Sequence, residues 1–225
     1  MRNLMGWMFI MLSIAGYSQD WAQLSRYKTE NERLGKPAPG ENRIVLMGNS
    51  ITEGWLEQYP EFFSGKPYVD RGISGQTTPQ MLIRFRQDVI ELQPKAVVIL
   101  AGTNDIAENT GPTTLPEIAG NIFSMVELAR VNGVEVLLCS VLPAADYPWR
   151  PGLKPAPKIA QLNQMLKDYA ERHNLIWVDY YSAMSDEKGG LRSEYTYDGV
   201  HPNRKGYEVM SEILERALKN LVKKE

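Results

Sequence analysis

Residues 43–55 read R-I-V-L-M-G-N-S-I-T-E-G-W, so an apolar run of strand length is followed by a short turn. An uninterrupted apolar run of this length is typical of a strand that is buried on both faces of a sheet. The turn leads towards Trp55 and places Ser50 at the junction between that strand and a helix. A serine there lies near unpaired backbone N–H groups, and two interpretations remain open: Ser50 reacts with a ligand, or it only caps the helix.

Runs of β-branched or apolar residues alternate with helical patterns along the chain. The expected strands span residues 43–48, 67–73, 96–100, 134–140 and 175–178. The helical patterns span residues 78–93, 115–132, 159–169 and 207–221, with Thr78 expected as the N-cap of the first and Pro79 in its first turn. Because crossovers between parallel strands run over the sheet and are nearly always right-handed, this order predicts an α/β fold with helices on both faces. Functional groups in such folds gather beyond the carboxyl ends of the strands.

The N-terminus has the pattern of a secretory signal peptide. Residues 4–15 are mostly apolar, follow Arg2 and precede the small residues Gly16 and Ser18. We expect residues 1–18 to be removed, since a membrane-spanning helix needs about 20 apolar residues. An uncleaved membrane anchor and a buried helix are the alternatives. The mature protein is therefore expected to be secreted or periplasmic, without stable insertion in a membrane.

Residues 19–42 form a polar N-terminal extension. In it Trp21, Leu24, Tyr27 and Leu34 are spaced as a short amphipathic element, which the P-A-P-G stretch at residues 37–40 ends. The remaining residues, 43–225, are expected to form one domain, because a chain of 225 residues is too short for two domains of about 150 residues each.

The charge balance and the scarcity of metal-binding side chains exclude several classes of function. Lys and Arg number 25 and Asp and Glu number 27, for a net charge of −2. A near-neutral chain exerts no strong attraction on nucleic acid or an anionic membrane, so no nucleic-acid partner is expected. With one cysteine, Cys139, and two histidines, His173 and His201, the sequence excludes an internal disulfide and a metal cluster of the Cys/His type.

Two further loops follow expected strands and carry groups that suit an active site. Residues 71–78 read R-G-I-S-G-Q-T-T, and glycines in such a loop let the backbone approach a ligand with an N–H group directed at it. Residues 102–105 read G-T-N-D, and the amide of Asn104 is able to donate to an oxyanion that develops during a reaction. The alternatives are a plain turn and an asparagine that stabilises a turn.

A base for a reactive serine is found near the C-terminus. Residues 198–203 read D-G-V-H-P-N, so Asp198 and His201 are three positions apart and fit one tight turn. An imidazole titrates in the useful range for accepting a serine proton, and a neighbouring carboxylate fixes its tautomer. His173 lies at an expected helix end, where a cation interacts favourably with the helix dipole, and we interpret it as structural. His201 is the remaining candidate base.

Taken together, four stretches resemble a known family. Residues 48–55, 71–77, 102–105 and 198–202 are similar to the four blocks of the SGNH (GDSL-type) hydrolases, in their platelet-activating-factor-acetylhydrolase-like branch, and occur in the family's order. The resemblance covers residues 43–220. It implies a flavodoxin-like three-layer sandwich with a five-stranded parallel sheet of order 2-1-3-4-5. It also implies ester hydrolysis without a metal or an organic cofactor.

Carried over block by block, the resemblance assigns roles to single residues. Ser50 would be the nucleophile, His201 the general base and then acid, and Asp198 its orienting partner. The backbone N–H groups of Ser50 and Gly75 and the side-chain amide of Asn104 would form the oxyanion hole. The chain departs from the family at residue 49, where Asn stands in place of the usual Asp. Because this position is outside the triad, the departure concerns the rigidity of the turn more than activity.

The expected substrates are small-molecule or glycan esters with short acyl groups, above all acetyl esters of carbohydrates. A lysophospholipase, a thioesterase, a broad short-chain esterase and a non-catalytic glycan-binding module are the alternatives. Residues 143–157, with Tyr147 and Trp149, form either an aromatic platform for sugar or a stiff proline-rich loop. Trp55 and Tyr197 either shape the acyl pocket or pack in the core. The leaving alcohol and the oligomeric state do not follow from the sequence.

Overall fold

The computed structural model describes residues 20–222. The expected signal peptide, residues 1–18, lies outside the described residues and stays a prediction. Within residues 20–222, no helix combines the length and the apolar character needed to cross a membrane.

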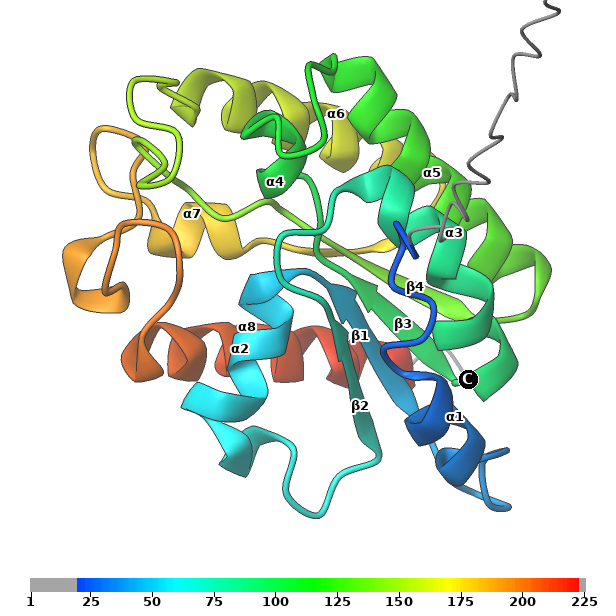
Figure 1. Ribbon diagram of the computed structural model, residues 1–225. Coiled ribbons are helices and arrows are strands. Elements are labelled where there is room, and N and C mark those ends of the chain that lie inside the picture. The colour runs from blue at the N-terminus through cyan, green and yellow to red at the C-terminus, as the bar shows by residue number, and fades with distance from the viewer. Residues whose placement is uncertain (1–19, 223–225) are drawn as a thin grey trace, which may run out of the picture.

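Five parallel strands form one sheet at the centre of the molecule (Figure 1). They are β1 (Ile44–Gly48), β2 (Tyr68–Gly72), β3 (Ala96–Ile99), β4 (Glu135–Cys139) and β5 (Ile176–Val178). Their order is β2-β1-β3-β4-β5, and in the register of β1 Ile44 pairs with Tyr68 of β2 on one side and with Ala96 of β3 on the other. The predicted fold class and strand order are confirmed.

Helices cover both faces of this sheet. They are α1 (Lys28–Leu34), α2 (Ser50–Gln58), α3 (Thr78–Asp88), α4 (Thr103–Ile106), α5 (Leu115–Val131), α6 (Ala156–Arg172), α7 (Tyr180–Met184) and α8 (Arg204–Val222). Short 3₁₀ turns occur at Pro60–Phe62, Ile90–Leu92 and Ser193–Tyr195. Helices α3, α5 and α6 pack on one face, and α2, α7 and α8 pack on the other (Figure 1).

Strands β1 and β3 are apolar throughout because each of their faces is covered. On β1, Val45 and Met47 belong to the core beneath α3 and α5, whereas Ile44 and Leu46 belong to the core beneath α8. All four side chains are at most 4% exposed. Burial on both faces is the reason that the deciding run lacks the polar alternation of a half-exposed strand.

The N-cap of α3 lies one residue earlier than the sequence predicts. Its N-cap is Thr77, whose backbone N–H donates to the Gln80 side chain at 3.0 Å, and Thr78 is already helical. The Thr78 hydroxyl instead donates to Asp105 Oδ1 at 2.6 Å. The Thr78 side chain, which was expected to cap the helix, therefore binds Asp105 instead.

The N-terminal extension lies along α3 before it forms α1 (Figure 1, dark blue). Gln80 Nε2 donates to the Trp21 carbonyl and Gln87 Nε2 to the Leu24 carbonyl, each at 2.7 Å. Tyr27 is buried as the amphipathic pattern predicts, but Trp21 and Leu24 are 47% and 39% exposed. Main-chain carbonyls, more than the expected apolar side chains, hold this segment to the domain.

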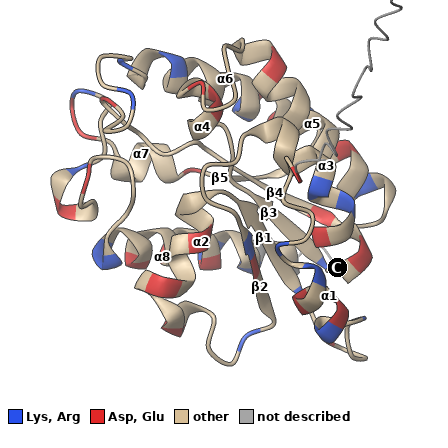
Figure 2. Cartoon of the chain, in the orientation of Figure 1, with Lys and Arg blue, Asp and Glu red and all other residues tan. Residues whose placement is uncertain are grey.

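Acidic and basic residues are interspersed along the outer helices (Figure 2). This distribution agrees with the near-neutral net charge of −2.

Asp70, on the edge strand β2, carries a buried and incompletely paired carboxyl group. Its Oδ1 accepts from the Gly72 N–H at 2.7 Å, while its buried Oδ2 has no hydrogen-bond partner among residues 20–222. Burial raises the pKa of Asp70 to about 7, and the Gly72 hydrogen bond and the Arg71 charge offset only part of this effect. Between the ordinary carboxyl pKa and about 7, the native state binds a proton that the unfolded state has lost. Stability therefore falls as the pH rises through this window.

Asp70→Asn removes the ionisable group and keeps an acceptor for the Gly72 N–H. We expect the variant to be more stable than wild type at pH 8 by about 1 kcal/mol or more, which is roughly 2–4 °C in Tm for a chain of this size. The difference should vanish as the pH approaches 4. Thermal unfolding followed by circular dichroism at pH 4, 6 and 8 measures it, and equal Tm values at pH 8 would contradict this account of Asp70.

Candidate active site

Ser50 is the first residue of α2, and only Asn49 separates it from Gly48, the last residue of β1. Asn49 is the N-cap: its Oδ1 accepts from the Ile51 N–H at 3.3 Å, and its carbonyl accepts from the Glu53 N–H at 2.9 Å. Asn49 is 2% exposed and thus supplies the turn acceptor without a charge. The junction leaves the backbone N–H of Ser50 at a helix N-terminus, where N–H groups lack partners within the helix.

A close approach between α2 and β2 brings this junction to the rim of the sheet. A Cβ atom on Gly72 would lie 2.1 Å from the Glu53 nitrogen and 2.7 Å from the Asn49 carbonyl oxygen. Glycine at the end of β2 therefore allows the first turn of α2 to rest against the strand.

The turn before α8 holds the carboxylate and the imidazole together. Asp198 Oδ1 accepts from the Val200 and His201 N–H groups at 2.9 and 2.7 Å, and its Oδ2 lies 2.7 Å from His201 Nδ1. Thr196 adds a second brace, since its hydroxyl donates to the His201 carbonyl at 2.7 Å and accepts from the Gly199 N–H at 2.9 Å. Asp198 and His201 were named from the sequence but Thr196 was not, although threonine hydroxyls are known to bond the backbone of nearby turns.

The structure brings Ser50 and His201 into contact, although they are 151 positions apart in the chain. Ser50 Oγ lies 2.9 Å from His201 Nε2. The side chains of His201 and Asp198 are 21% and 26% exposed, so the pair borders solvent. Burial acts to raise the pKa of Asp198, but hydrogen bonds from His201 and from backbone N–H groups outweigh it and hold this pKa below its usual value. Asp198 is consequently ionised at neutral pH and favours a proton on His201 Nδ1.

The loop after β2 contains the second predicted block. Residues 73–76 form a turn in which the Gln76 N–H donates to the Ile73 carbonyl at 3.3 Å. Gly75 occupies this turn with φ of +77°, a conformation that other residues rarely adopt. Glu53 of α2 holds the same turn, because its Oε2 accepts from the Ser74 N–H at 2.9 Å.

Asn104, from the third block, lies in α4 and is 3% exposed. Its Nδ2 donates to the Gln76 carbonyl at 3.0 Å. An amide group has two N–H donors, so this bond fixes the side chain and leaves one donor for a ligand. The bond also joins the Asn104 block to the loop that carries Gly75.

Asp105, next to Asn104, has a part in the site that sequence reasoning did not assign. Its carboxylate accepts from the Thr78 N–H at 2.9 Å and from the Thr78 hydroxyl at 2.6 Å. Burial raises the pKa of Asp105, and the Thr78 hydrogen bonds counteract part of that rise. The interaction anchors the start of α3 to α4 and hence the end of the Gly75 loop to Asn104. The sequence signal for this role is Asp105 itself, the acidic residue that ends the G-T-N-D stretch.

Two exposed aromatic side chains flank His201. The Trp149 ring centroid lies 5.8 Å from that of His201, and the Tyr197 centroid lies 5.9 Å from it with the planes nearly parallel. Trp149 and Tyr197 are 40% and 66% exposed. Trp149 stacks on the buried ring of Tyr147 and donates from Nε1 to Asn109 at 3.1 Å. Residues 143–157 thus present an aromatic face beside the imidazole.

A hollow of about 300 Å³ adjoins this aromatic face and Asp198. Tyr147, Pro148, Pro151 and Asp186 are among its lining residues. Trp55, in contrast, belongs to the core: it is 1% exposed, stacks on Phe62 and donates to Ser211. Of the two aromatic residues considered for the acyl pocket, only Tyr197 lies at the surface.

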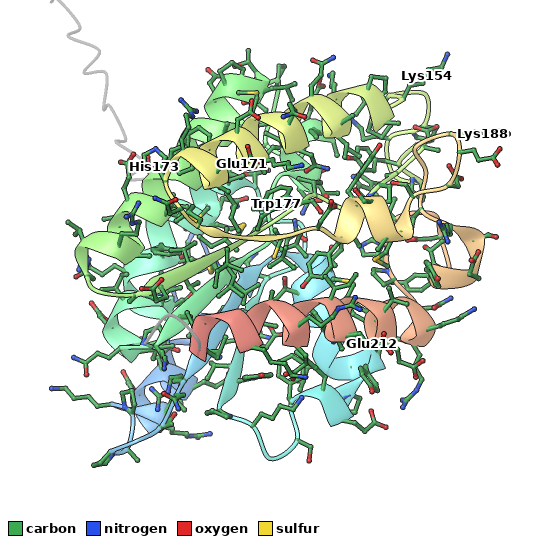
Figure 3. The ribbon with its side chains drawn as sticks, turned by 180° about the vertical axis from the view of Figure 1, so that it is seen from behind. Lys154, Glu171, His173, Trp177, Lys188 and Glu212 are labelled. Atoms are coloured by element: carbon green, nitrogen blue, oxygen red, sulfur yellow. The ribbon has the colours of Figure 1, made fainter. Side chains whose placement is uncertain are left out.

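The second histidine lies away from these groups. His173 stacks on Tyr169 at the end of α6, as expected for a structural residue. Figure 3 shows it at the end of the molecule opposite to the loops that carry Lys154 and Lys188. Within residues 20–222, no group of three or more His, Cys, Asp or Glu side chains is arranged to hold a metal ion, and Cys139 is buried as a free thiol.

Residues 46–209 match the model of the GDSL-like lipase/acylhydrolase family, which is most of the chain. The chain belongs to this family. The resemblance noted in the four blocks is thereby confirmed, and the protein is a carboxylic ester hydrolase.

Solved and curated relatives agree with this placement of the GDSL-like hydrolase. A GDSL-like lipase from Bacteroides thetaiotaomicron is 49% identical, with a TM-score of 0.86 and coverage of 88% of this chain and 98% of that chain. The platelet-activating factor acetylhydrolase IB subunit alpha2 of Homo sapiens is 27% identical over 192 residues, which cover 81% of this chain and 78% of the relative. An acetylxylan esterase of Xylanibacter ruminicola is 25% identical over 221 residues, or 81% of this chain and 45% of the relative.

The geometry of the first block predicts the effect of removing the cap. Asn49→Ala deletes the acceptor for the Ile51 N–H at the start of α2, so the free energy of unfolding should fall by about 1 kcal/mol or somewhat more. Asn49→Ser, which keeps a capping oxygen, should recover much of this loss. Urea unfolding of the two variants and wild type measures the difference. Equal stability of the Ala and Ser variants would show that the cap contributes little.

Proposed function

We propose that this protein is a serine esterase that removes short acyl groups, chiefly acetyl, from esterified carbohydrates. One observation carries the proposal: Ser50 Oγ, the His201 imidazole and the Asp198 carboxylate form a continuous hydrogen-bonded chain at the carboxyl edge of the sheet. A serine hydroxyl is a weak nucleophile unless a base accepts its proton, and this chain supplies the base and fixes its tautomer.

In the first half of the proposed reaction, Ser50 Oγ attacks the ester carbonyl carbon while its proton passes to His201 Nε2. The imidazolium that forms is stabilised by the Asp198 carboxylate 2.7 Å from Nδ1. The tetrahedral intermediate then collapses, the bond between the carbonyl carbon and the alcohol oxygen breaks, and His201 donates the proton to the departing alcohol. The product of this half is an acyl-serine.

The negative oxygen of the intermediate needs donors that are already in place. We assign this role to the N–H groups of Ser50 and Gly75 and to the free N–H of the Asn104 amide. The positive φ of Gly75 and the bond from Asn104 to the Gln76 carbonyl support the assignment, because they fix both groups before substrate arrives. Each such donor typically contributes about 3 kcal/mol to stabilising the transition state.

In the second half, a water molecule takes the place of the alcohol. His201 Nε2 accepts a proton from it, the oxygen attacks the acyl carbon, and collapse of the second intermediate returns the proton to Ser50 Oγ. A carboxylic acid is released and the free enzyme is restored. No other co-reactant is required.

The carbohydrate part of the proposal rests on the surroundings of His201. Trp149 and Tyr197 present exposed aromatic rings close to the imidazole, and the hollow lined by Asp198 also borders Tyr147, on which Trp149 stacks. Flat aromatic faces suit the apolar faces of sugar rings. Two relatives are named for the acetyl group, one as an acetylhydrolase and one as an acetylxylan esterase, which supports a short acyl chain here. Export by the expected signal peptide would bring the enzyme to extracellular glycans.

The proposed chemistry is tested by acetate release from a panel of acetylated polysaccharides and sialic acids. Ser50→Ala and His201→Ala should fold as wild type does and lose nearly all turnover, and Asp198→Asn should lower kcat by about 10⁴-fold because the imidazole is no longer held in one tautomer. Circular dichroism controls for folding. Wild-type rates in the Ser50 or His201 variant would defeat the assignment.

Acyl-chain profiling and active-site labelling separate the other candidate functions. A steep preference for acetyl over octanoyl esters is expected, whereas the opposite preference would favour a lysophospholipase or a thioesterase. A fluorophosphonate probe should label Ser50 and no other residue. A well-folded protein that binds acetylated glycans but stays unlabelled would be a glycan-binding module.

The aromatic face predicts a selective effect on glycan substrates. Trp149→Ala should raise KM for an acetylated xylo-oligosaccharide about tenfold, in line with the usual worth of one aromatic contact, and leave kcat/KM for 4-nitrophenyl acetate within about twofold. Trp149→Phe is the matched control, because it loses the same bond to Asn109 but keeps a ring. If the Ala and Phe variants behave alike on the oligosaccharide, the ring face does not bind sugar.

A further inference from the structure

Residues 20–27, here called the N-terminal strap, lie against the loop of residues 72–77, here called the oxyanion loop. The strap runs along α3 at the side of the sheet where β2 ends (Figure 1, dark blue). It is fixed to α3 by hydrogen bonds from Gln80 to the Trp21 carbonyl and from Gln87 to the Leu24 carbonyl. Three separate contacts then join the strap to the oxyanion loop or to the group that braces it.

The first contact joins Tyr27 to the start of the loop. The Tyr27 hydroxyl donates to the Gly72 carbonyl, and the side chain is 5% exposed. The guanidinium groups of Arg26 and Arg71 lie over its ring at 4.8 and 4.5 Å from the centroid. Burial raises the pKa of Tyr27, so the hydroxyl keeps the proton that it donates. The bond fixes the residue from which the loop leaves β2.

The second contact passes through the side chain of Gln76, which is 1% exposed. Its Nε2 donates to the Ala22 carbonyl at 2.8 Å, and its Oε1 accepts from Arg84 Nε at 2.6 Å. Arg84 is fully buried and donates from Nη2 to the carbonyls of Gly48 and Arg71, both at 2.9 Å. Gln76 therefore connects the strap, through Arg84, to the carboxyl ends of β1 and β2.

The third contact uses Glu53, at the first turn of α2. Arg26 Nη2 lies 3.4 Å from Glu53 Oε1, and Glu53 Oε2 accepts from the Ser74 N–H at 2.9 Å. The strap arginine thus holds the carboxylate that holds the turn next to Gly75. This ion pair is partly exposed, and we expect it to contribute less than the two buried contacts.

These contacts lead to the proposed oxyanion donors. Gln76 follows Gly75 directly, and the Gln76 carbonyl accepts the Asn104 amide at 3.0 Å. A shift of Gln76 would consequently move the Gly75 N–H and the Asn104 side chain together. Donors in an oxyanion hole act only when they are held in the position that the transition state requires.

We propose that the N-terminal strap positions the oxyanion hole, so that residues outside the four family blocks set the transition-state stabilisation by Gly75 and Asn104. This inference rests on the proposed serine esterase mechanism. Tyr27 and Gln76 are positioning residues, since they act through the loop and touch no reacting atom. The strap contributes to kcat through the geometry of the hole and has no direct part in binding the ground-state substrate.

The test compares two identical substitutions on neighbouring elements. Tyr27→Phe removes the hydroxyl bound to Gly72, and Tyr68→Phe is the matched control, because it removes a hydroxyl on β2 that lies 3.2 Å from Glu215. With 4-nitrophenyl acetate, Tyr27→Phe should lower kcat about tenfold with KM within about twofold, and Tyr68→Phe should change neither by more than about twofold. Inhibition by a short-chain trifluoromethyl ketone, which forms a tetrahedral oxyanion on the serine, should weaken by the same factor as kcat/KM.

A double variant separates positioning from a general loss of stability. In an Asn104→Ala background, where one donor is already absent, Tyr27→Phe should lower kcat by less than it does in wild type. Arg26→Met leaves Tyr27 in place and should lower kcat by less than Tyr27→Phe does. It allows the strap proposal to be tested even if Tyr27→Phe fails to fold. Equal kcat for Tyr27→Phe and Tyr68→Phe, or equal kcat for Arg26→Met and wild type if Tyr27→Phe does not fold, would overturn the strap proposal.

The same measurements distinguish failure of the strap from failure of the mechanism. If Ser50→Ala is inactive while the strap variants retain full activity and full sensitivity to the ketone, only the strap proposal is wrong. If Ser50→Ala retains activity, the serine esterase mechanism is wrong and the strap has no oxyanion hole to position.

Discussion

The Ser50 hydroxyl and the His201 imidazole are 151 positions apart in the chain, yet their Oγ and Nε2 atoms lie 2.9 Å from one another. The candidate active site depends on this contact. Parallel strands deliver their carboxyl ends to one edge of the sheet, which brings the turn after β1 and the turn before α8 to the same rim. The first turn of α2 reaches that rim because Gly72 leaves room for the Glu53 backbone. Without this close approach, the serine at the start of α2 would be displaced from His201.

The supporting groups differ in how they act. Asp198 acts on His201 directly, with one oxygen on the imidazole and the other on two backbone N–H groups of the same turn. Asp105 and Arg84 act at longer range, by joining the ends of strands and helices to the oxyanion loop. Buried carboxyl and guanidinium groups in such positions are stable only when hydrogen bonds satisfy them, and Asp105 and Arg84 both have such bonds. The aromatic residues Trp149 and Tyr197 beside His201 lie instead at the surface, where we propose that they bind the sugar part of the substrate.

The sheet and the first contacts of the site were predictable because they depend on local patterns. Apolar runs identified the strands, and the spacing of Asp198 and His201 identified their shared turn. The N-cap at Thr77 was not predicted because Asp105, 27 positions further along the chain, binds the Thr78 side chain. The contacts of the strap were not predicted for a related reason. The strap is held through its own main-chain carbonyls at Trp21, Ala22 and Leu24, and because every residue has a carbonyl, no sequence pattern marks these three. The sequence also could not tell whether each tryptophan is buried, because the tertiary fold alone decides that Trp55 is buried and Trp149 is exposed.

A crystal structure of the protein after reaction with a short-chain alkyl phosphonate tests the central claim most directly, because the adduct resembles the tetrahedral intermediate. The account predicts phosphorus bonded to Ser50 Oγ, with the phosphoryl oxygen within hydrogen-bond distance of the Ser50 and Gly75 N–H groups and of Asn104 Nδ2. His201 Nε2 should face the oxygen of the serine or of the leaving group. An adduct on another residue, or a phosphoryl oxygen directed at solvent, would contradict it.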